Sequence, residues 1–369
     1  MALGSAKHLA YVPILKWKRG EQMALASLEA PVRRRILPLA EIQDRPYDWQ
    51  VEAYTKSWRP HIDAVAVATA KYWGQDQEIA IDQPLEGSSG DDAEKDFASP
   101  WRYLFERLWD EGVQAVPVVS SWASPQEVAE LARLQKNLTH RRFLLRCRFD
   151  EEEHGTSARA VGLWFRKTLK RLHARHADVD AVFDLGYLAG SVEEGATENY
   201  CLSVLRELSL QGPWRTLTLA SGAFPVNLAG FKTGAHAIER KDWKLYERVV
   251  DQTLGGVLYG DYGVNYTDAF DMDPRAIRMS ANLRYTHFDH WRVYKARSVK
   301  EYGFDQYKQL CQLLVASSEY FGPGFSEGDK SIFSMATDLS KGPGNATTWR
   351  RDAMNHHLHV VLNQLEKRR

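Results

Sequence analysis

The chain has 369 residues, and its 48 lysines and arginines balance 48 aspartates and glutamates. This balance argues against the strongly basic surface of a dedicated nucleic-acid-binding protein, although it still allows a local basic groove. Three scattered cysteines and the lack of any apolar run of membrane-spanning or signal-peptide length argue against a disulfide framework, a zinc knuckle and a membrane protein, so we expect a cytoplasmic location.

Eight short apolar segments with strand character recur along residues 11–264, and helical patterns follow most of them. In chain order they are Tyr11–Lys18, Arg35–Ile42, Glu78–Gln83, Ala115–Ser121, Phe143–Phe149, Ala181–Leu185, Thr216–Ser221 and Gly256–Tyr262. Alternating strands and helices favour parallel βαβ units, and eight units are the number that closes a (β/α)8 barrel. The sequence therefore predicts an α/β fold in which residues 1–264 form a TIM-barrel-like (β/α)8 domain.

Helical patterns and loop signals separate these strands. The expected helices are Glu21–Leu28, Arg59–Trp73, Pro100–Glu111, a helix capped at Ser124, Ser157–His176, one around Tyr200–Ser209, and Asp242–Gln252. Pro38 lies inside the second strand segment and cannot donate a ladder hydrogen bond, which argues against a fully bonded strand there. The Gly, Ser and Asp cluster at Gly87–Asp96 predicts a mobile loop over the barrel mouth.

Residues 265–369 differ in character and predict a mainly α-helical C-terminal extension packed on the barrel. Ala281–Ser298 is rich in aromatic residues and arginine and predicts one or two short strands or a long loop. Asp305–Phe321 is the expected helix that closes the barrel, and Asn345–Leu365 is the expected terminal helix. Because both helices have apolar residues at helical spacing, they need a surface to cover, so the extension should be an integral part of the fold.

Charged residues at the ends of the predicted strands are the strongest functional signal. In a (β/α)8 barrel the C-terminal strand ends face the mouth, where enzymes of this fold have their active sites. The candidate catalytic residues are the carboxylates Glu41, Asp82, Asp184 and Asp261, and the candidate ligand-binding residues are Lys16, Lys18, Arg146 and Arg148. Each of Lys16, Glu41, Asp82, Arg148, Asp184 and Asp261 shares strand parity with apolar residues that we place inside, so we expect one polar pocket.

Two interpretations of this ring of charged residues at the strand ends remain open. Four converging carboxylates repel one another unless a shared proton, a bound divalent cation such as Mg²⁺, or the neighbouring lysines and arginines compensate them. In the structural interpretation the ring is a set of salt bridges that closes the top of the barrel. In the functional interpretation the lysines and arginines bind an anionic ligand, because paired arginines suit the geometry of phosphate and carboxylate groups.

Motifs at both ends of the chain point to a family. They are Tyr11–Lys18, Gly20-Glu21, Ala24-Leu25 and Pro38–Ile42 near the N-terminus, and Ala281–Thr286, Tyr307, Cys311, Phe325–Asp329, Trp349-Arg350 and Asn355–His357 near the C-terminus. In this combination and order the chain resembles the bacterial Beta family proteins, a group also found on phages and mobile elements. The resemblance implies a genomic context of phage conflict, and it implies no particular reaction or catalytic residue.

Three functions fit these observations. The first is a hydrolase-type enzyme that acts on a phosphorylated, nucleotide-like or nucleic-acid ligand, with a carboxylate that activates water with or without Mg²⁺. The second is a non-catalytic sensor or interaction protein that uses the same pocket to recognise a phage or defence-system component. The third is a glycoside hydrolase built on Asp184 and Asp261 with Tyr187 and Tyr262 beside them, which the lysines and arginines disfavour.

The histidines near the C-terminus invite a metal-site interpretation that helix geometry disfavours. His356, His357 and His359 lie in a predicted helix, where adjacent residues point about 100° apart and residues two apart do not share a face. They therefore cannot converge as the i, i+4 pair of a zinc peptidase does. We expect packing and hydrogen-bonding roles for them.

Overall fold

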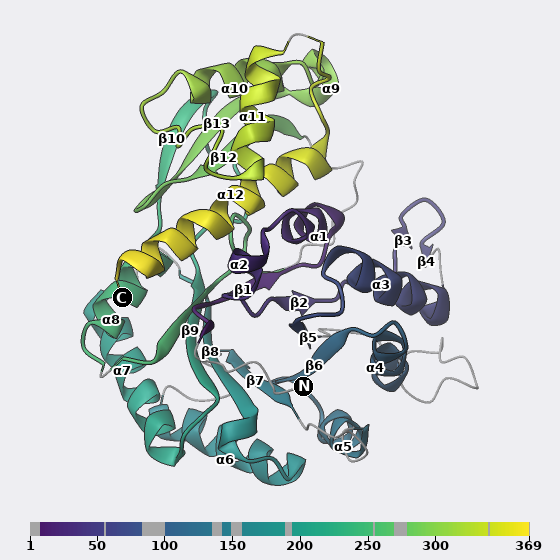
Figure 1. Cartoon of the computed structure of the whole chain (residues 1–369), viewed down its shortest axis with the longest axis vertical. Helices are drawn as coiled ribbons and strands as arrows, with labels where there is room; N and C mark the ends of the chain where they lie inside the picture. The colour runs from purple at the N-terminus through teal and green to yellow at the C-terminus, as the bar shows by residue number, and fades with distance from the viewer. Residues whose placement is uncertain are drawn as a thin grey trace.

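The computed structural model contains one closed barrel of eight parallel strands, as the sequence predicts (Figure 1). It describes residues 8–54, 57–82, 100–134, 142–148, 157–188, 194–253, 255–268, 279–338 and 340–368. The barrel strands are β1 (Tyr11–Leu15), β2 (Leu39–Glu41), β5 (Glu78–Asp82), β6 (Gln114–Ser120), β7 (Phe143–Arg148), β8 (Val179–Tyr187), β9 (Thr216–Gly222) and β11 (Val257–Asp261). They pair in this order, and β11 pairs with β1 to close the barrel.

Helices lie around the outside of the barrel. They are α1 (Arg19–Ala26), α2 (Ala30–Arg33), α3 (Trp58–Tyr72), α4 (Pro100–Asp110), α5 (Pro125–Leu134), α6 (Ala158–Leu172), α7 (Glu194–Gln211) and α8 (Lys241–Val250), with a short 3-10 helix at His176–Asp178. A small hairpin, β3 (Tyr47–Asp48) and β4 (Ala53–Tyr54), precedes α3. The predicted mobile loop at Gly87–Asp96 lies outside the described residues.

Strand β2 and helix α6 are shorter than predicted, and each has a local cause. Strand β2 begins directly after Pro38, because proline has no N–H to donate to the ladder. Helix α6 ends at Leu172, because His173 adopts the left-handed conformation that terminates helices.

Strand parity divides the barrel residues into an inner and an outer set. The inner apolar layer comprises Val12, Ile14, Leu39, Ala80, Val116, Val118, Leu144, Val182 and Ala220. Residues of the opposite parity pack against the surrounding helices, among them Tyr11, Leu15, Ile81, Val119, Leu145, Phe183, Leu219 and Tyr259. Because side chains alternate along a strand, this parity decides which strand-end residues face the barrel mouth.

A second sheet of three antiparallel strands lies beside the barrel (Figure 1). Its order is β10 (Gly234–Glu239), β13 (His290–Ser298) and β12 (Ser280–Thr286), so Ala281–Ser298 forms two strands rather than a loop. Strand β10 comes from the loop between β9 and α8, so residues before 264 also contribute to this sheet. The remaining elements are α9 (Val299–Tyr302), α10 (Gln306–Val315), α11 (Glu327–Thr337) and α12 (Ala346–Lys367).

Helix α12 occupies the position of the helix that closes the barrel, and the prediction of Asp305–Phe321 for this role is wrong. Helix α12 packs against α1 and β1, and Arg368 just beyond its end forms an ion pair of 2.7 Å with Glu247 of α8. Helix α10 ends at Val315 and packs on α11 and β12 instead. The long α12 covers both the barrel and the second sheet, which α10 is too short to do. Within the described ranges, no helix has the length and apolar character needed to cross a membrane.

Candidate functional site

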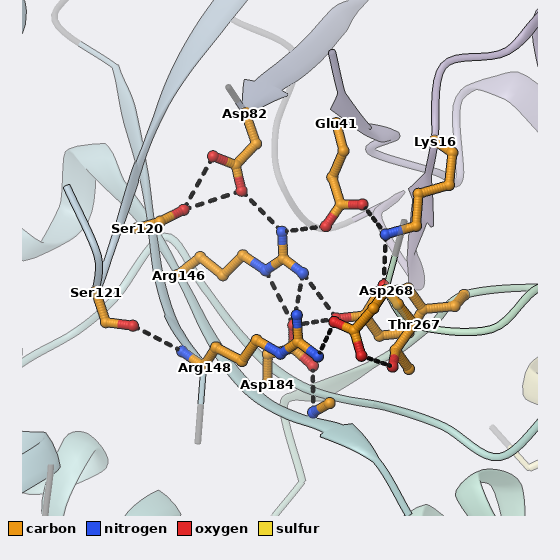
Figure 2. A network of polar contacts seen from close by, with 12 residues as sticks. Lys16, Glu41, Asp82, Ser120, Ser121, Arg146, Arg148, Asp184, Thr267 and Asp268 are labelled. Carbon is orange, nitrogen blue, oxygen red and sulfur yellow. Dashed lines mark hydrogen bonds and ion pairs between the residues drawn. The ribbon is translucent and has the colours of Figure 1, made fainter. Parts of the chain in front are cut away.

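The C-terminal ends of the barrel strands hold a buried polar network that we call the Arg146 cluster (Figure 2). It consists of Lys16, Glu41, Asp82, Ser120, Arg146, Asp184 and Tyr262. These residues come from, or directly follow, β1, β2, β5, β6, β7, β8 and β11. The cluster lies directly above the inner apolar layer, so it forms the upper end of the barrel interior.

Arg146 is the centre of this cluster and is fully buried. Its Nη1 donates to Glu41 Oε1 and to Asp82 Oδ2, both at 2.7 Å. Its Nε and Nη2 donate to Asp184 Oδ2 at 2.9 and 2.7 Å, and Nη2 also contacts the Tyr262 hydroxyl at 2.7 Å. The guanidinium thus bridges three carboxylates at once.

Lys16 and Ser120 donate further hydrogen bonds to two of these carboxylates, those of Glu41 and Asp82. Lys16 Nζ donates to Glu41 Oε2 and to the backbone carbonyl of Thr267. The Ser120 hydroxyl lies 2.9 Å from both carboxylate oxygens of Asp82. Asp184 Oδ1 accepts from the backbone N–H of Gly186 at 2.9 Å. Every charged group of the cluster therefore has a partner.

The cluster has one more acidic than basic group, and its carboxyl groups differ in proton affinity. Three carboxyl groups face the two cations Lys16 and Arg146. Burial opposes ionisation of Glu41, but Lys16 and Arg146 outweigh it and lower the pKa of this carboxyl below its ordinary value. For Asp82 burial dominates, and with repulsion from Glu41 it raises the pKa despite Arg146. Asp82 is therefore the carboxyl of this pair that holds a proton more readily.

Arg148 lies at the rim of the cluster and is partly exposed. It pairs with Asp268 at 2.5 Å, and the two side chains are 27% and 41% exposed, whereas that of Arg146 is 0% exposed. Its guanidinium lies against Gly186, where a Cβ atom would come within 3.0 Å of Nε. Gly186 also has a φ of +62°, so glycine suits this position for two independent reasons.

The model of the family described as "Beta protein" matches residues 11–363, nearly the whole chain. The chain belongs to the Beta protein family. The matched residues include those of the barrel and those of the second sheet. A comparison with curated proteins gave no match.

In this Beta protein family member, Arg148 lies at the rim of the cluster, and the predicted site residues Lys18 and Asp261 lie away from both the cluster and its rim. Lys18 is exposed and stands at the start of α1, because β1 ends at Leu15 and the chain then leaves the barrel. Asp261 lies on the outer face of β11. We expected it inside, but the inward residues of this segment are Gly260 and Tyr262. A side chain at Gly260 would meet Ala220 Cβ at 2.8 Å, so the interior has no room for one there.

Asp261 instead joins the barrel to α12. Its Oδ1 accepts from the Tyr11 hydroxyl at 2.5 Å, and its Oδ2 lies 2.9 Å from Nε2 of the fully buried His357. His357 Nδ1 lies 2.9 Å from the Thr286 hydroxyl of β12. His356 pairs with Asp329 at 2.8 Å instead, so the neighbouring histidines bind different partners, as helix geometry predicts.

We predict that Asp261→Asn lowers stability at neutral pH and that this loss shrinks in acid. Burial opposes ionisation, but His357 and other partners lower the pKa of Asp261 from its ordinary value of 3.8 to about 2. The carboxylate therefore contributes stability above about pH 4, and this contribution disappears as the pH falls toward about 2. Urea unfolding of both proteins across this range measures the difference. The exposed Asp76→Asn serves as the control, and a difference that does not change with pH would contradict the prediction.

A second set of ion pairs at the opposite end of the barrel was not expected from the sequence. Arg215 contacts Asp180 Oδ2 at 2.8 Å and Glu78 Oε2 at 2.7 Å, and Arg142 contacts the same two carboxylates at 2.8 and 3.0 Å. Thr216 donates to Asp180 at 2.6 Å. These residues lie at the N-terminal strand ends, where a (β/α)8 barrel places residues that serve stability. Glu78, Arg142 and Asp180 share strand parity with Asp82, Arg146 and Asp184, and this parity is the sequence signal that could have revealed them.

Proposed function

We propose that the chain binds an anionic ligand at the barrel mouth through Arg148. The observation that carries the proposal is the contrast between two arginines on one strand. Arg146 is fully buried, and all of its guanidinium nitrogens have partners. Arg148 points the same way but reaches solvent. Among the carboxylates of the described residues, it has only the partly exposed Asp268 at hydrogen-bonding distance. The Asp268 carboxylate is then the group that a phosphate or carboxylate ligand replaces.

The Arg146 cluster supports this site as a rigid base. Each of its carboxylates already accepts from the guanidinium, so the cluster is held in one arrangement before a ligand arrives. The same saturation does not fit Mg²⁺, which needs carboxylate oxygens free to coordinate it. We therefore assign anion binding to the arginine and involve no metal in it.

The ligand classes that fit a rim guanidinium are a phosphorylated small molecule, a nucleotide and a nucleic acid. The resemblance to proteins found on phages and mobile elements favours a sensor that recognises such a ligand during phage conflict. A partner protein from the phage or from a defence system would respond to the bound state. Because the Arg146 cluster is built of satisfied ion pairs, recognition is better supported than catalysis.

A hydrolytic reaction is the second candidate, and one observation favours it. The raised pKa of Asp82 suits a group that donates a proton to a leaving group. The glycoside hydrolase hypothesis loses its support, because Asp184 faces the barrel interior while Asp261 faces α12. The two carboxyl groups that were to flank a glycosidic bond lie on opposite faces of the barrel wall. Asp82→Asn tests the hydrolase candidate, which requires it to abolish any turnover of a ligand that the chain binds.

We predict that Arg148→Ala weakens anion binding by about 1.5 to 3 kcal/mol, because it removes a charge-assisted hydrogen bond. Asp268→Asn should have the opposite effect and tighten binding, because it removes the competing carboxylate. Calorimetric titration of the full chain with inorganic phosphate, nucleotides and a short oligonucleotide measures both effects.

Arg166→Ala is the matched control, since this arginine also pairs with one carboxylate, Glu207, but lies on the outer helix α6. The proposal predicts unchanged binding for this variant. Equal affinities for the parent, Arg148→Ala and Asp268→Asn, or no binding of any of these probes, would refute the assignment.

A further inference from the structure

The turn between β12 and β13 brings two imidazoles and a carboxylate together. Ligand atoms of His287, Asp289 and His290 all lie within 4.8 Å of one another. Asp289 Oδ1 lies between the rings, 2.8 Å from His290 Nδ1 and 3.7 Å from His287 Nδ1. The two rings are nearly parallel, with centroids 4.8 Å apart. Three atoms of types that bind transition metals therefore lie close to one another.

The backbone of this turn is held from two sides. Arg240 Nη1 donates to the carbonyls of His287 and Phe288 at 3.1 and 3.2 Å, and Arg240 N donates to Asp289 O at 2.9 Å. Gln364 of α12 also donates to Phe288 O at 2.9 Å. A turn fixed in this way presents its side chains in one geometry, which is what a metal site needs.

A buried ring nitrogen gives an independent reason to expect a ligand. His287 Nδ1 is buried, and its distance of 3.7 Å to Asp289 Oδ1 exceeds a hydrogen bond. A buried polar atom without a partner is costly, so native structures normally satisfy it. A cation held beside Asp289, at the edges of the two rings that carry Nδ1, satisfies this nitrogen, His290 Nδ1 and the carboxylate together.

His290 also has a carboxylate near its second ring nitrogen, although the two form no hydrogen bond in the present geometry. Its second ring nitrogen, Nε2, lies 3.4 Å from Glu319 Oε1. Arg292 fixes this carboxylate by donating to both of its oxygens. Metal-bound histidines commonly donate their other N–H to a carboxylate, which orients the ring and increases its basicity.

We propose that His287, Asp289 and His290 bind a divalent transition-metal ion, with Zn²⁺ as the best-fitting representative. Zn²⁺ binds histidine nitrogen and carboxylate oxygen at about 2.0 to 2.2 Å, which separates neighbouring tetrahedral ligands by roughly 3.4 Å. The present separations of 2.8 and 3.7 Å lie on either side of this value. Three protein ligands leave a fourth position open for water or an external ligand. This site is separate from the barrel mouth and does not depend on the proposed anion binding.

The test is calorimetric titration of the full chain, without a polyhistidine tag and after chelator treatment, with Zn²⁺ alone. Native mass spectrometry gives the stoichiometry, and Co²⁺ absorption reports tetrahedral coordination. We expect one ion per chain in the parent. Asp289→Asn and His290→Gln should abolish this binding. Asp289→Asn is the more informative of the two variants, because the Asp289 side chain is 65% exposed and its replacement disturbs the fold least.

Two further variants make the outcome decisive. Glu319→Gln should retain the site but weaken Zn²⁺ binding by about 10- to 100-fold, as expected of an outer partner. His236→Gln, on the neighbouring strand β10, should bind like the parent and controls for surface histidines. Melting curves establish that each variant is folded. Absence of Zn²⁺ binding in the parent, or equal binding in the folded Asp289→Asn and His290→Gln variants, would overturn the proposal.

Discussion

Replacement of Arg146 by alanine is expected to lower the free energy of unfolding by about 3 to 5 kcal/mol, the cost of leaving buried charges uncompensated. The variant retains Glu41, Asp82 and Asp184 in the barrel interior with only Lys16 as a cation. Urea unfolding at neutral pH measures the loss. It should diminish in acid, because protonation of Glu41 and Asp82 removes much of the repulsion that Arg146 otherwise compensates.

Arg107→Ala is the matched control for this experiment. Arg107 also contacts three carboxylates, those of Asp63, Asp110 and Glu111, but it does so at the protein surface. Solvent screens such pairs, so the loss should be far smaller than for Arg146. Similar losses in the two variants would mean that the Arg146 cluster has no special structural role.

Ending the chain after Val264 is expected to leave no cooperatively folded protein. This truncation removes α12 from its contacts with α1 and β1 and takes His357 away from the buried Asp261. It also strips β10 of its partner β13. Solubility, near-UV circular dichroism and thermal unfolding of residues 1–264 measure the outcome.

The control for this truncation removes only residues 368 and 369, which follow α12. That variant should fold and unfold like the full chain, apart from the loss of the exposed Arg368 ion pairs. A soluble fragment of residues 1–264 with a sharp unfolding transition would instead establish the barrel as an independent domain.

The sequence predicts the barrel well because its strands are buried on both faces and therefore form compact apolar runs. It fails for β10, whose residues Gly234–Glu239 are mostly exposed and have no such run. This strand forms because β13 offers it hydrogen bonds, and β13 lies more than 50 residues further along the chain. The prediction of the closing helix is wrong for a similar reason. Apolar spacing alone indicates an amphipathic helix at both Asp305–Phe321 and α12, and it does not tell which of them packs on the barrel.

Parity explains both the success and the errors at the candidate site. The parity rule predicts that Lys16, Glu41, Asp82, Arg148 and Asp184 share the inner face with apolar residues, and they lie in the Arg146 cluster or, for Arg148, at its rim. In β11 the apolar residues Val257, Leu258 and Tyr259 occupy both parities, so periodicity could not decide the direction of Asp261. The tight contact of Gly260 with Ala220 decides it, and that contact exists only in the folded barrel.

The two sets of interior ion pairs have a consequence for how the barrel assembles. Arg146 lies in strand β7 and Arg142 directly before it, and their ion pairs lie at opposite ends of the barrel interior. If the barrel is divided before β7, the interior of the N-terminal half has an excess of carboxylates, and that of the C-terminal half has an excess of arginines. Each half pairs part of its own charge, as Lys16 does with Glu41 and Arg142 with Asp180, but the remaining excess in each half is compensated by the other half. In one half Glu41, Glu78 and Asp82 face the single cation Lys16, and in the other Arg142, Arg146 and Arg215 face Asp180 and Asp184.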